Sequence, residues 1–345
     1  MTGIHISCAV NNVEALSYLP MASNNVALVT EGGGQRGIFT AGVLDAFLDA
    51  EYNPFSLLVG TSAGSLNIAS FICGQTKHAY RIITEATTTH DFFDLPRFLL
   101  GKEGLDLDWL LEQTQTRLPL DWQQGHENMR SRTVLACACR ADNHRASFFD
   151  LNNDDWQTAL KASCAIPILR RQPILNQQEY WVDGGVGAPI PAQEAYDRGY
   201  RHIVVIRTVP ITANFDHCWM SIISKALGKT KASNLISLLL EHEDNYRRTQ
   251  DFLNNPPDDA TIYEIHPNKD LHSKLIGSNT DSLDHDYQLG YRSGRYFMAT
   301  LGRSLSTPNM PVTADESSDN IPQDPAFTSH AAQNCEEVRD QKLCA

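Results

Sequence analysis

A serine stands among small residues in the segment Gly60-Thr61-Ser62-Ala63-Gly64, directly after the apolar run Phe55–Val59 and before a helix-like stretch. This order suits a nucleophile held on a sharp turn between a strand and a helix, where bulkier neighbours would collide with the backbone. A serine in such a place can attack a carbonyl carbon once a base takes its proton. We therefore expect Ser62 to be the nucleophile of an acyl-transfer reaction, with an elbow made of Gly60, Thr61, Ala63 and Gly64.

A second glycine-rich segment, Gly32-Gly33-Gly34-Gln35-Arg36-Gly37, lies one strand and one helix upstream. Such a loop exposes backbone N–H groups that can hold the negative charge developing on a carbonyl oxygen. We expect the amides of Gly33 and Gly34 to face the site, and the dipole of the helix that begins near Arg36 to add positive potential. Arg36 equally suits a structural role, in which it ties the loop to a carboxylate. The predicted oxyanion site comprises Gly32, Gly33, Gly34, Arg36 and Gly37.

The same glycine loop also fits the Gly-x-Gly-x-x-Gly pattern of dinucleotide-binding proteins. Those proteins place an acidic residue about 20 positions later, at the tip of the second strand. Here that strand ends in Val59-Gly60-Thr61-Ser62, without a carboxylate, and neither glycine segment has the Gly-Lys-Ser/Thr ending of a Walker phosphate loop. Nucleotide or cofactor binding by an α/β protein is thus an alternative with less support, as is a structural turn that binds nothing.

Three histidines, His202, His266 and His285, come late enough in the chain to follow the order serine, aspartate, histidine of a catalytic triad. His202 opens a predicted buried strand and His266 ends one, and neither lies in a glycine-rich loop. We expect these histidines to be structural.

Asp183 is the better candidate for the base. It follows an apolar strand and precedes Gly184 and Gly185, so its carboxyl would project from a tight turn. Burial at such a turn favours the neutral acid and raises the pKa, which makes the carboxylate a stronger base. An aspartate before glycine is also a common turn residue, so this motif alone is weak evidence.

The glycine loop, the serine pentapeptide and Asp183-Gly184-Gly185 occur in one order, with Ala162-Ser163-Cys164-Ala165-Ile166-Pro167 before the last of them. In this combination, over about residues 26–207, the chain resembles the patatin-like phospholipase family, specifically its bacterial members. The resemblance implies a three-layer α/β/α sandwich with a mainly parallel central sheet. It further implies a Ser62–Asp183 dyad without histidine, the hydrolysis of lipid acyl esters through an acyl-serine, and no metal or organic cofactor.

One segment departs from the family pattern. An Asn-x-Pro often follows the Asp-Gly-Gly turn in that family, whereas this chain continues Val186-Gly187-Ala188-Pro189-Ile190-Pro191. The difference bears on the lining near the dyad, and so on substrate preference, more than on the reaction. Separately from this departure, a third hypothesis is a non-catalytic relative that retains the fold and binds a lipid or a partner protein.

Strands and helices are expected to alternate along the chain, which favours a parallel sheet covered by helices on both faces. The first unit has strands at 26–30 and 55–59 and helices at 38–51 and 63–73, set by apolar periodicity. The later expected elements are strands at 133–139, 146–150, 180–182, 202–207 and 261–266, and helices at 154–161, 192–198, 219–227, 234–253 and 287–301.

The 345 residues divide into an N-terminal extension (1–24), one hydrolase domain (25–303) and an acidic tail (304–345) with seven acidic and two basic residues. The tail is rich in Ser, Pro and Asn, a composition that does not order itself. A net charge of −13 argues against a nucleic-acid partner. Cys137 and Cys139 are expected to be core residues.

No apolar run is long enough to span a membrane and no export signal is visible, so the expected location is the cytoplasm, peripherally at the inner membrane face. The expected partner is a phospholipid or another acyl-ester lipid, met in transient contact with a membrane surface. Residues 217–240 contain an apolar stripe beside Lys225, Lys229 and Lys231. This stretch suits a lipid-facing element, although an apolar helical stripe is more often part of the core.

Overall fold

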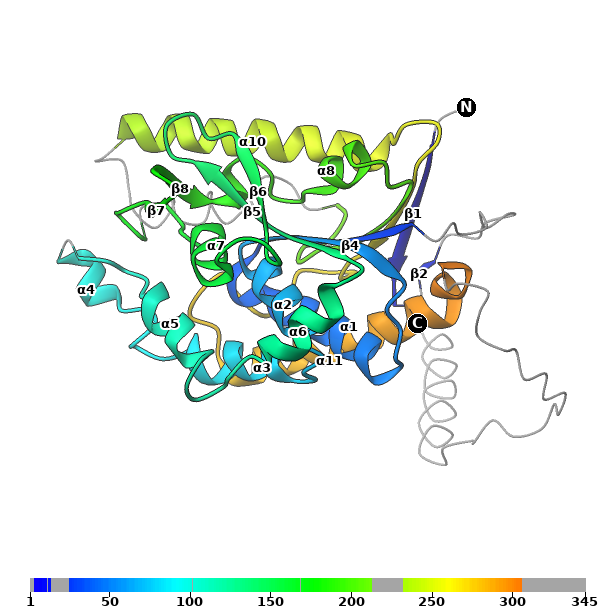
Figure 1. Ribbon diagram of the computed structural model, residues 1–345, viewed down its shortest axis with the longest axis horizontal. Coiled ribbons are helices and arrows are strands. Elements are labelled where there is room, and N and C mark those ends of the chain that lie inside the picture. The colour runs from blue at the N-terminus through cyan, green and yellow to red at the C-terminus, as the bar shows by residue number, and fades with distance from the viewer. Residues whose placement is uncertain are drawn as a thin grey trace, which may run out of the picture. The chain divides into compact units, whose positions relative to one another are not determined.

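The computed structural model describes residues 3–10, 12–13, 25–100, 102–167, 169–212 and 232–305, all within a compact unit, Met1–Thr307 (Figure 1). At its centre lies one sheet in the order β2-β1-β10-β9-β3-β4-β5-β8-β7, with β6 paired to β5 off this path. The strands are β1 (Ile4–Ala9), β2 (Asn12–Val13), β3 (Val26–Thr30), β4 (Phe55–Thr61), β5 (Thr133–Arg140), β6 (Ala146–Asp150), β7 (Ile174–Asn176), β8 (Glu179–Asp183), β9 (His202–Ile206) and β10 (Thr261–Ile265).

The sheet is mainly parallel, as expected. Strands β1, β10, β9, β3, β4 and β5 are neighbours that all run in one direction. Strands β2, β6, β8 and β7 join the two ends of this block by antiparallel pairing. Strands covered on both faces are apolar throughout, and accordingly every residue of β3 and of β9 is buried.

Helices cover both faces and complete the three layers (Figure 1). Leu28 and Leu58 point to the layer that contains α1 (Gly37–Asp49), α2 (Ala63–Ile72) and α11 (Thr280–Thr300). Ala27 and Val29 point to the opposite layer, which contains α8 (Ala192–Asp197) and α10 (Ala232–Asn254). The alternation along β3 follows from the two-residue period of a strand.

The chain between α2 and β5 forms a group of short helices: α3 (His78–Arg81), the π-helical turn η2 (Ile82–Ala86), α4 (Leu95–Leu99), α5 (Leu107–Gln113) and α6 (Trp122–Met129). The sequence pattern predicts none of these elements. Three of these helices begin at an aspartate, Asp94, Asp106 and Asp121, whose side chain accepts a backbone N–H of the first turn. Such caps satisfy amides that a short helix cannot bond internally.

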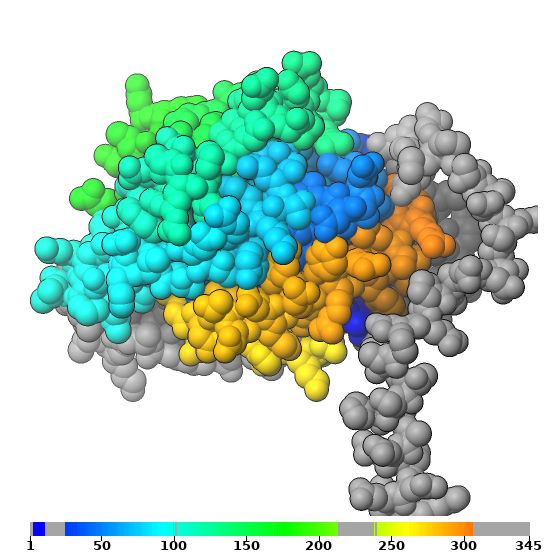
Figure 2. Space-filling view, turned by 90° about the horizontal axis from the view of Figure 1, so that it is seen from below, coloured from blue at the N-terminus to red at the C-terminus, as the bar shows by residue number. Residues whose placement is uncertain are grey.

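Of these short helices, α3 and η2 pack beside α11, and Figure 2 shows light-blue to cyan segments next to orange ones on one face. Tyr80 and Tyr287 contact each other with ring centroids 4.7 Å apart, and the hydroxyl of Tyr80 donates to Asp284. Ala79 and Ile83 lie in the same apolar cluster. The remaining helical elements are α7 (Trp156–Ser163) and the 3-10 turns η1 (Gly34–Arg36), η3 (Gly184–Val186) and η6 (Gly302–Leu305).

The structure differs from expectation at the N-terminus. Residues 1–24 were expected to form an extension outside the domain, yet Ile4–Ala9 forms β1, which pairs with β10 inside the sheet. A six-residue strand with mixed residues has too weak a pattern to be found without its partner. The expected helix at 219–227 and the acidic tail from residue 306 onward lie outside the described residues. Within the described part, no helix combines the length and apolar character needed to cross a membrane.

Candidate active site

Ser62 occupies the turn between β4 and α2, as predicted. Its backbone has φ 53° and ψ −127°, a region that residues other than glycine rarely adopt and that costs about 1–3 kcal/mol. Close packing explains the small neighbours. A Cβ atom on Gly60 would lie 2.6 Å from the amide nitrogen of Ser65, and one on Gly64 would lie 2.7 Å from the carbonyl oxygen of Thr30. The strained serine is therefore wedged between two sites where only glycine fits.

Hydrogen bonds from the end of α7 hold this turn. The Oγ atom of Ser163 accepts the backbone N–H of Ser62 at 2.9 Å. The hydroxyl of Ser65 lies 3.1 Å from Ser163 Oγ and donates to the carbonyl of Ser62 at 2.6 Å. Ser163 is fully buried. Hydrogen bonds thus hold both the backbone N–H and the backbone carbonyl of Ser62.

The strand register places Asp183 level with Ser62. Thr61, the last residue of β4, pairs with Cys137 of β5, and the following residue of β5, Ala138, pairs with Asp183 of β8. Adjacent strands lie about 4.8 Å apart. Ser62 and Asp183 therefore end two strands at the same height, separated by β5 alone.

The carboxyl of Asp183 is fully buried. Its Oδ1 atom accepts the N–H of Gly185 at 2.7 Å, while Oδ2 has no hydrogen-bond partner among the described residues. Burial raises the pKa of Asp183 to about 7, and this increase is opposed by the Gly185 amide and by the Ser62 hydroxyl, which both favour the charged form. Ser62 lowers the pKa of Asp183 because its hydroxyl is close to the carboxyl, although no hydrogen bond joins the side chains of Ser62 and Asp183. An aspartate in this state can accept a proton near neutral pH.

The glycine loop, which runs from β3 into α1, lies beside Ser62. Gly34 has φ +56°, and a Cβ atom there would lie 2.3 Å from the carbonyl oxygen of Leu275. The amide of Gly32 donates to Pro189 O at 3.2 Å, and that of Gly37 points to the carbonyls of Gln35 and Gly34. Among the described residues, no group accepts from the amides of Gly33 or Gly34. Of the predicted oxyanion residues, these two retain free donors.

Arg36 is buried, and its Nε atom donates to the carbonyl of Gly33 at 3.4 Å. This contact favours the structural role for Arg36, because the guanidinium braces the loop from within. The neighbouring Gln35 joins two further segments. Its Nε2 atom donates to Thr87 O at 3.0 Å, and its Oε1 atom accepts the N–H of Ser278 at 2.8 Å.

A buried charged network, which no sequence motif indicates, supports the glycine loop. The Oε2 atom of Glu31 accepts the N–H of Thr208 at 2.6 Å, and Tyr246 donates to Glu31 Oε1 at 3.2 Å. Arg207 donates to Glu264 at 2.7 Å and to the Tyr246 hydroxyl at 2.6 Å. The Arg207 guanidinium is the main group that lowers the pKa of Glu264, to about 2, against the burial that raises it. Its members are far apart in sequence, so no local pattern reveals the network.

Segment 186–191, which departs from the family pattern, contacts both the serine turn and the glycine loop through its backbone. Ala188 O accepts the hydroxyl of Thr61 at 2.8 Å, and Pro189 O accepts the amide of Gly32. Val186 O accepts the side-chain amide of Asn245 at 3.1 Å. Backbone carbonyl contacts depend little on side-chain identity. Segment 186–191 can therefore hold the serine turn and the glycine loop in place although its side chains differ from the family pattern.

The three late histidines lie in other surroundings. His266 pairs with Ser7 at 2.7 Å and His285 with Asp286 at 2.9 Å, while His202 lies 3.5 Å from the Tyr263 hydroxyl. Among the described residues, none of the three bonds to Ser62 or Asp183.

His242 of α10, which no sequence motif indicates, contacts the Asp183-Gly184-Gly185 turn instead. Its Nδ1 atom donates to the carbonyl of Gly185, and burial lowers its pKa to about 4. This neutral histidine positions the turn that follows Asp183. Cys137 and Cys139 are buried in β5 beside Gly184, as expected of core residues.

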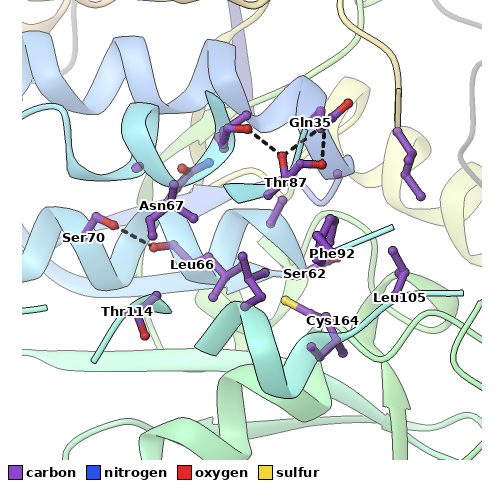
Figure 3. Close-up of a pocket in the computed structure, with 18 of the residues that line it drawn as sticks. Gln35, Ser62, Leu66, Asn67, Ser70, Thr87, Phe92, Leu105, Thr114 and Cys164 are labelled. Atoms are coloured by element: carbon purple, nitrogen blue, oxygen red, sulfur yellow. Dashed lines mark hydrogen bonds between the residues drawn. The ribbon is translucent and has the colours of Figure 1, made fainter. Parts of the chain in front are cut away.

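Ser62 opens into a pocket with an empty volume of about 810 Å³, which includes space open to solvent. Figure 3 shows Ser62 near Phe92, Leu105 and Cys164, with Leu66 farther along α2. Most of the lining is apolar and comes from the short helices that follow α2. The apolar side chains are Ala63, Leu66, Ala79, Ile82, Ile83, Phe92, Leu105, Leu107, Leu110, Leu120, Ile166, Leu275 and Ile276.

One group of side chains in the described residues has the ligand atoms of a metal site. His272, His285 and Asp286 bring such atoms within 4.8 Å of one another. Both oxygens of Asp286 already interact, Oδ1 with His285 and Oδ2 with the N–H of Ser273, and the two imidazole rings stack at 4.1 Å. None of the three lines the pocket, so the group has no place in the chemistry of Ser62.

Comparison with known proteins identifies the class that this fold and site define: the chain belongs to the patatin-like phospholipase family, as the sequence motifs predicted. Residues 28–196 match the model of patatin-like phospholipases, and residues 232–306 match a domain of unknown function (DUF6363). The chain is similar to the uncharacterized protein YjjU of Escherichia coli (strain K12), with 41% identity over 312 residues that cover 90% of this chain and 87% of that protein.

Two solved structures are also similar at low sequence identity. VipD from Legionella pneumophila is 12% identical with a TM-score of 0.44, over 87% of this chain and 70% of that one. Human GIVD cytosolic phospholipase A2, in complex with methyl γ-linolenyl fluorophosphonate, is 10% identical with a TM-score of 0.43, over 85% of this chain and 60% of that one.

Proposed function

We propose that this protein is a lipid acyl hydrolase of the phospholipase A or lysophospholipase type, with Ser62 as nucleophile and Asp183 as base. The observation that carries the proposal is a strained, buried serine that lines an apolar pocket, level with a buried aspartate whose pKa burial raises to about 7. Membership of the patatin-like phospholipase family supports it.

The reaction has two steps. Ser62 Oγ attacks the ester carbonyl carbon while Asp183 takes the hydroxyl proton, and the amides of Gly33 and Gly34 hold the oxyanion. The tetrahedral intermediate collapses, the C–O bond to the alcohol breaks, and Asp183 returns the proton to the leaving alkoxide. A water molecule that gives its proton to Asp183 then attacks the acyl-serine, which releases the fatty acid and restores Ser62.

The surroundings suit each role. Oδ2 of Asp183 is the oxygen left without a hydrogen bond among the described residues, so it is the one available to accept a proton. The glycine loop is fixed through the bonds of its flanking residues, so its donors need no reorganisation when charge develops. The apolar lining fits an acyl chain better than the phosphates of a nucleotide, which need charged or amide partners along their length.

Hydrolysis of a panel of phospholipids, lysophospholipids and acylglycerols tests the proposal. The wild-type protein should release fatty acid from at least one lipid class, and Ser62→Ala should lower the rate of release by a factor of about 10³ or more. The proposal fails if wild type and Ser62→Ala release fatty acid at the same rate. A rise in melting temperature with a dinucleotide, without hydrolysis, would favour the alternative of cofactor binding.

A further inference from the structure

The pocket runs along α2, away from the nucleophile. Ser62, Leu66 and Ser70 all line it, and they follow one another at intervals of four residues, which places them on one face of the helix. Eight residues of α-helix span about 12 Å. Figure 3 shows Leu66 between Ser62 and Ser70, with Thr114 beyond Leu66 on the side away from Ser62. The pocket therefore has a reactive end at Ser62 and a far end near Ser70 and Thr114.

Hydrogen-bonded polar side chains close the far end. Ser70 Oγ lies 2.8 Å from Nδ1 of His78, and Nε2 of His78 lies 2.9 Å from the carbonyl oxygen of Leu118. Thr114 donates to the carbonyl of Leu111 at 2.7 Å. Ser70, His78 and Thr114 are each less than a tenth exposed. These three polar side chains are therefore largely shielded from solvent.

The protonation of His78 follows from its partners. A carbonyl oxygen can only accept, so Nε2 carries the hydrogen that goes to Leu118. Burial lowers the pKa of His78, so the ring is neutral and Nδ1 accepts the hydrogen of Ser70, whose Oγ lies closer to Nδ1, at 2.8 Å, than to the carbonyl oxygen of Leu66, at 3.3 Å. Both ring nitrogens thus have hydrogen-bond partners. A ligand group that displaced the ring or Ser70 would leave buried polar atoms without partners.

We propose that this pocket binds the acyl chain of the substrate with its methyl end against the Ser70–His78 pair, which limits the chain to medium length. This inference rests on the proposed function and adds its substrate class. Carbon–carbon bonds of about 1.5 Å at angles near 111° advance an extended chain by about 1.25 Å per carbon. A span of about 12 Å then holds an acyl group of about ten carbons.

Chain-length dependence tests the proposal on the wild-type protein. We would measure kcat/KM for p-nitrophenyl esters with acyl chains of four to sixteen carbons, below their aggregation concentrations. Each methylene buried in the pocket should raise kcat/KM about four-fold, the equivalent of about 0.8 kcal/mol. The expected profile peaks near ten carbons and falls at least ten-fold by sixteen. A profile that is flat, or that still rises at sixteen carbons, overturns the proposal.

Two variants locate the limit. His78→Ala removes the ring from the far end, so the peak should move by two or more carbons toward longer esters. Thr114→Phe fills the same end, so the peak should move toward shorter esters by a similar amount. If both variants keep the wild-type peak, the far end does not set the length. Should His78→Ala fail to fold, Thr114→Phe still decides the question.

The chain offers a matched control. His266 forms an equivalent buried serine–histidine pair with Ser7, at 2.7 Å, and does not line the pocket. His266→Ala should therefore keep the peak where the wild type has it, and a shifted peak in this control would contradict the assignment to the pocket. One experiment distinguishes failure of the chain-length limit from failure of the proposed function. Hydrolysis that depends on Ser62 but lacks a peak refutes the chain-length limit alone, and the absence of such hydrolysis refutes the proposed function.

Discussion

The hydroxyl oxygen of Ser163 accepts the backbone N–H of Ser62 at 2.9 Å, although the two residues are 101 positions apart. Two residues after Ser163, the carbonyl of Ala165 accepts the N–H of Asp183 at 2.9 Å. One short segment at the end of α7 thus holds both members of the proposed dyad. This gives a physical reason for the small-residue stretch 162–167, which the sequence motifs only associated with the dyad turn.

Ser163→Ala should lower kcat by about 10- to 100-fold while changing KM little, because the variant loosens the position of Ser62 and Ser163 does not line the apolar pocket. It should also cost about 1–3 kcal/mol of stability, since the amide of Ser62 loses its partner in a buried site. Steady-state kinetics and urea unfolding measure the two effects. Ser293→Ala, a buried serine of α11 that bonds within its own helix, is the control and should keep the wild-type kcat. Equal loss of kcat in both variants would assign the effect to stability alone.

Replacing Ser62 separates strain from function. Ser62→Gly and Ser62→Ala should both be inactive, but glycine adopts φ 53° without the cost that alanine pays. We expect Ser62→Gly to be the more stable by about 1 kcal/mol, after allowance for the greater freedom of glycine in the unfolded chain. Thermal unfolding of the two variants provides the comparison. A lower melting temperature for the glycine variant would show that the turn is unstrained.

Asp183→Asn should be inactive yet more stable than the wild type at pH 8. Because burial raises the folded-state pKa of Asp183 from 3.8 to about 7, its contribution to stability is present below pH 3.8 and is lost as pH rises through 7. A neutral amide keeps the hydrogen bond from Gly185 and avoids that loss, so the gain at pH 8 is up to about 4 kcal/mol. At pH 3 the two proteins should be equally stable. Denaturant unfolding at the two pH values checks this, and a gain of equal size at both would contradict it.

The same ionisation should govern activity. The base must be deprotonated before Ser62 attacks, so kcat/KM should rise with pH to a plateau with a midpoint near 7. An aspartate exposed to solvent would instead give a midpoint near about 4. A pH profile on a soluble ester measures this midpoint, and a plateau that already begins at pH 5 would exclude Asp183 as the base with a raised pKa.

Glu264 should give the protein an acid-sensitive contribution to stability. Its pKa falls from 4.5 to about 2 in the folded state, chiefly through Arg207, so that contribution is present above pH 4.5 and is lost as pH falls toward 2. The destabilisation caused by Glu264→Gln should therefore be larger at pH 6 than at pH 3. Unfolding free energies of the two proteins at both pH values decide this. A destabilisation that does not change with pH would mean that Glu264 is not stabilised as an anion.

The sequence predicts much of this structure where local patterns are strong. The strands at 26–30 and 146–150 are confirmed with the same limits, and Ser62 lies between a strand and a helix, where its motif predicts it. The glycine pattern also has a local cause, as the contacts of Gly60, Gly64 and Gly34 show. Such features are encoded within a few residues, so they can be found without tertiary contacts.

The remainder depends on contacts between distant residues. Much of the apolar pocket comes from the short elements α3, η2 and α5 and the loops after them, which are too brief for a periodic pattern. The bracing of the glycine loop joins Glu31 to Thr208 and Tyr246, and His242 reaches the dyad turn from α10. Strand β1 is likewise defined by its partner β10. None of these relationships has a signature within a single stretch of sequence.

Covalent labelling by an alkyl fluorophosphonate, with the modified peptide located by mass spectrometry, tests the central claim most directly. The account predicts a single adduct on Ser62 in the wild-type protein and labelling at least 100-fold slower in Asp183→Asn, whose neutral side chain cannot take the proton. An adduct on another residue, or equal labelling rates in the two proteins, would contradict it.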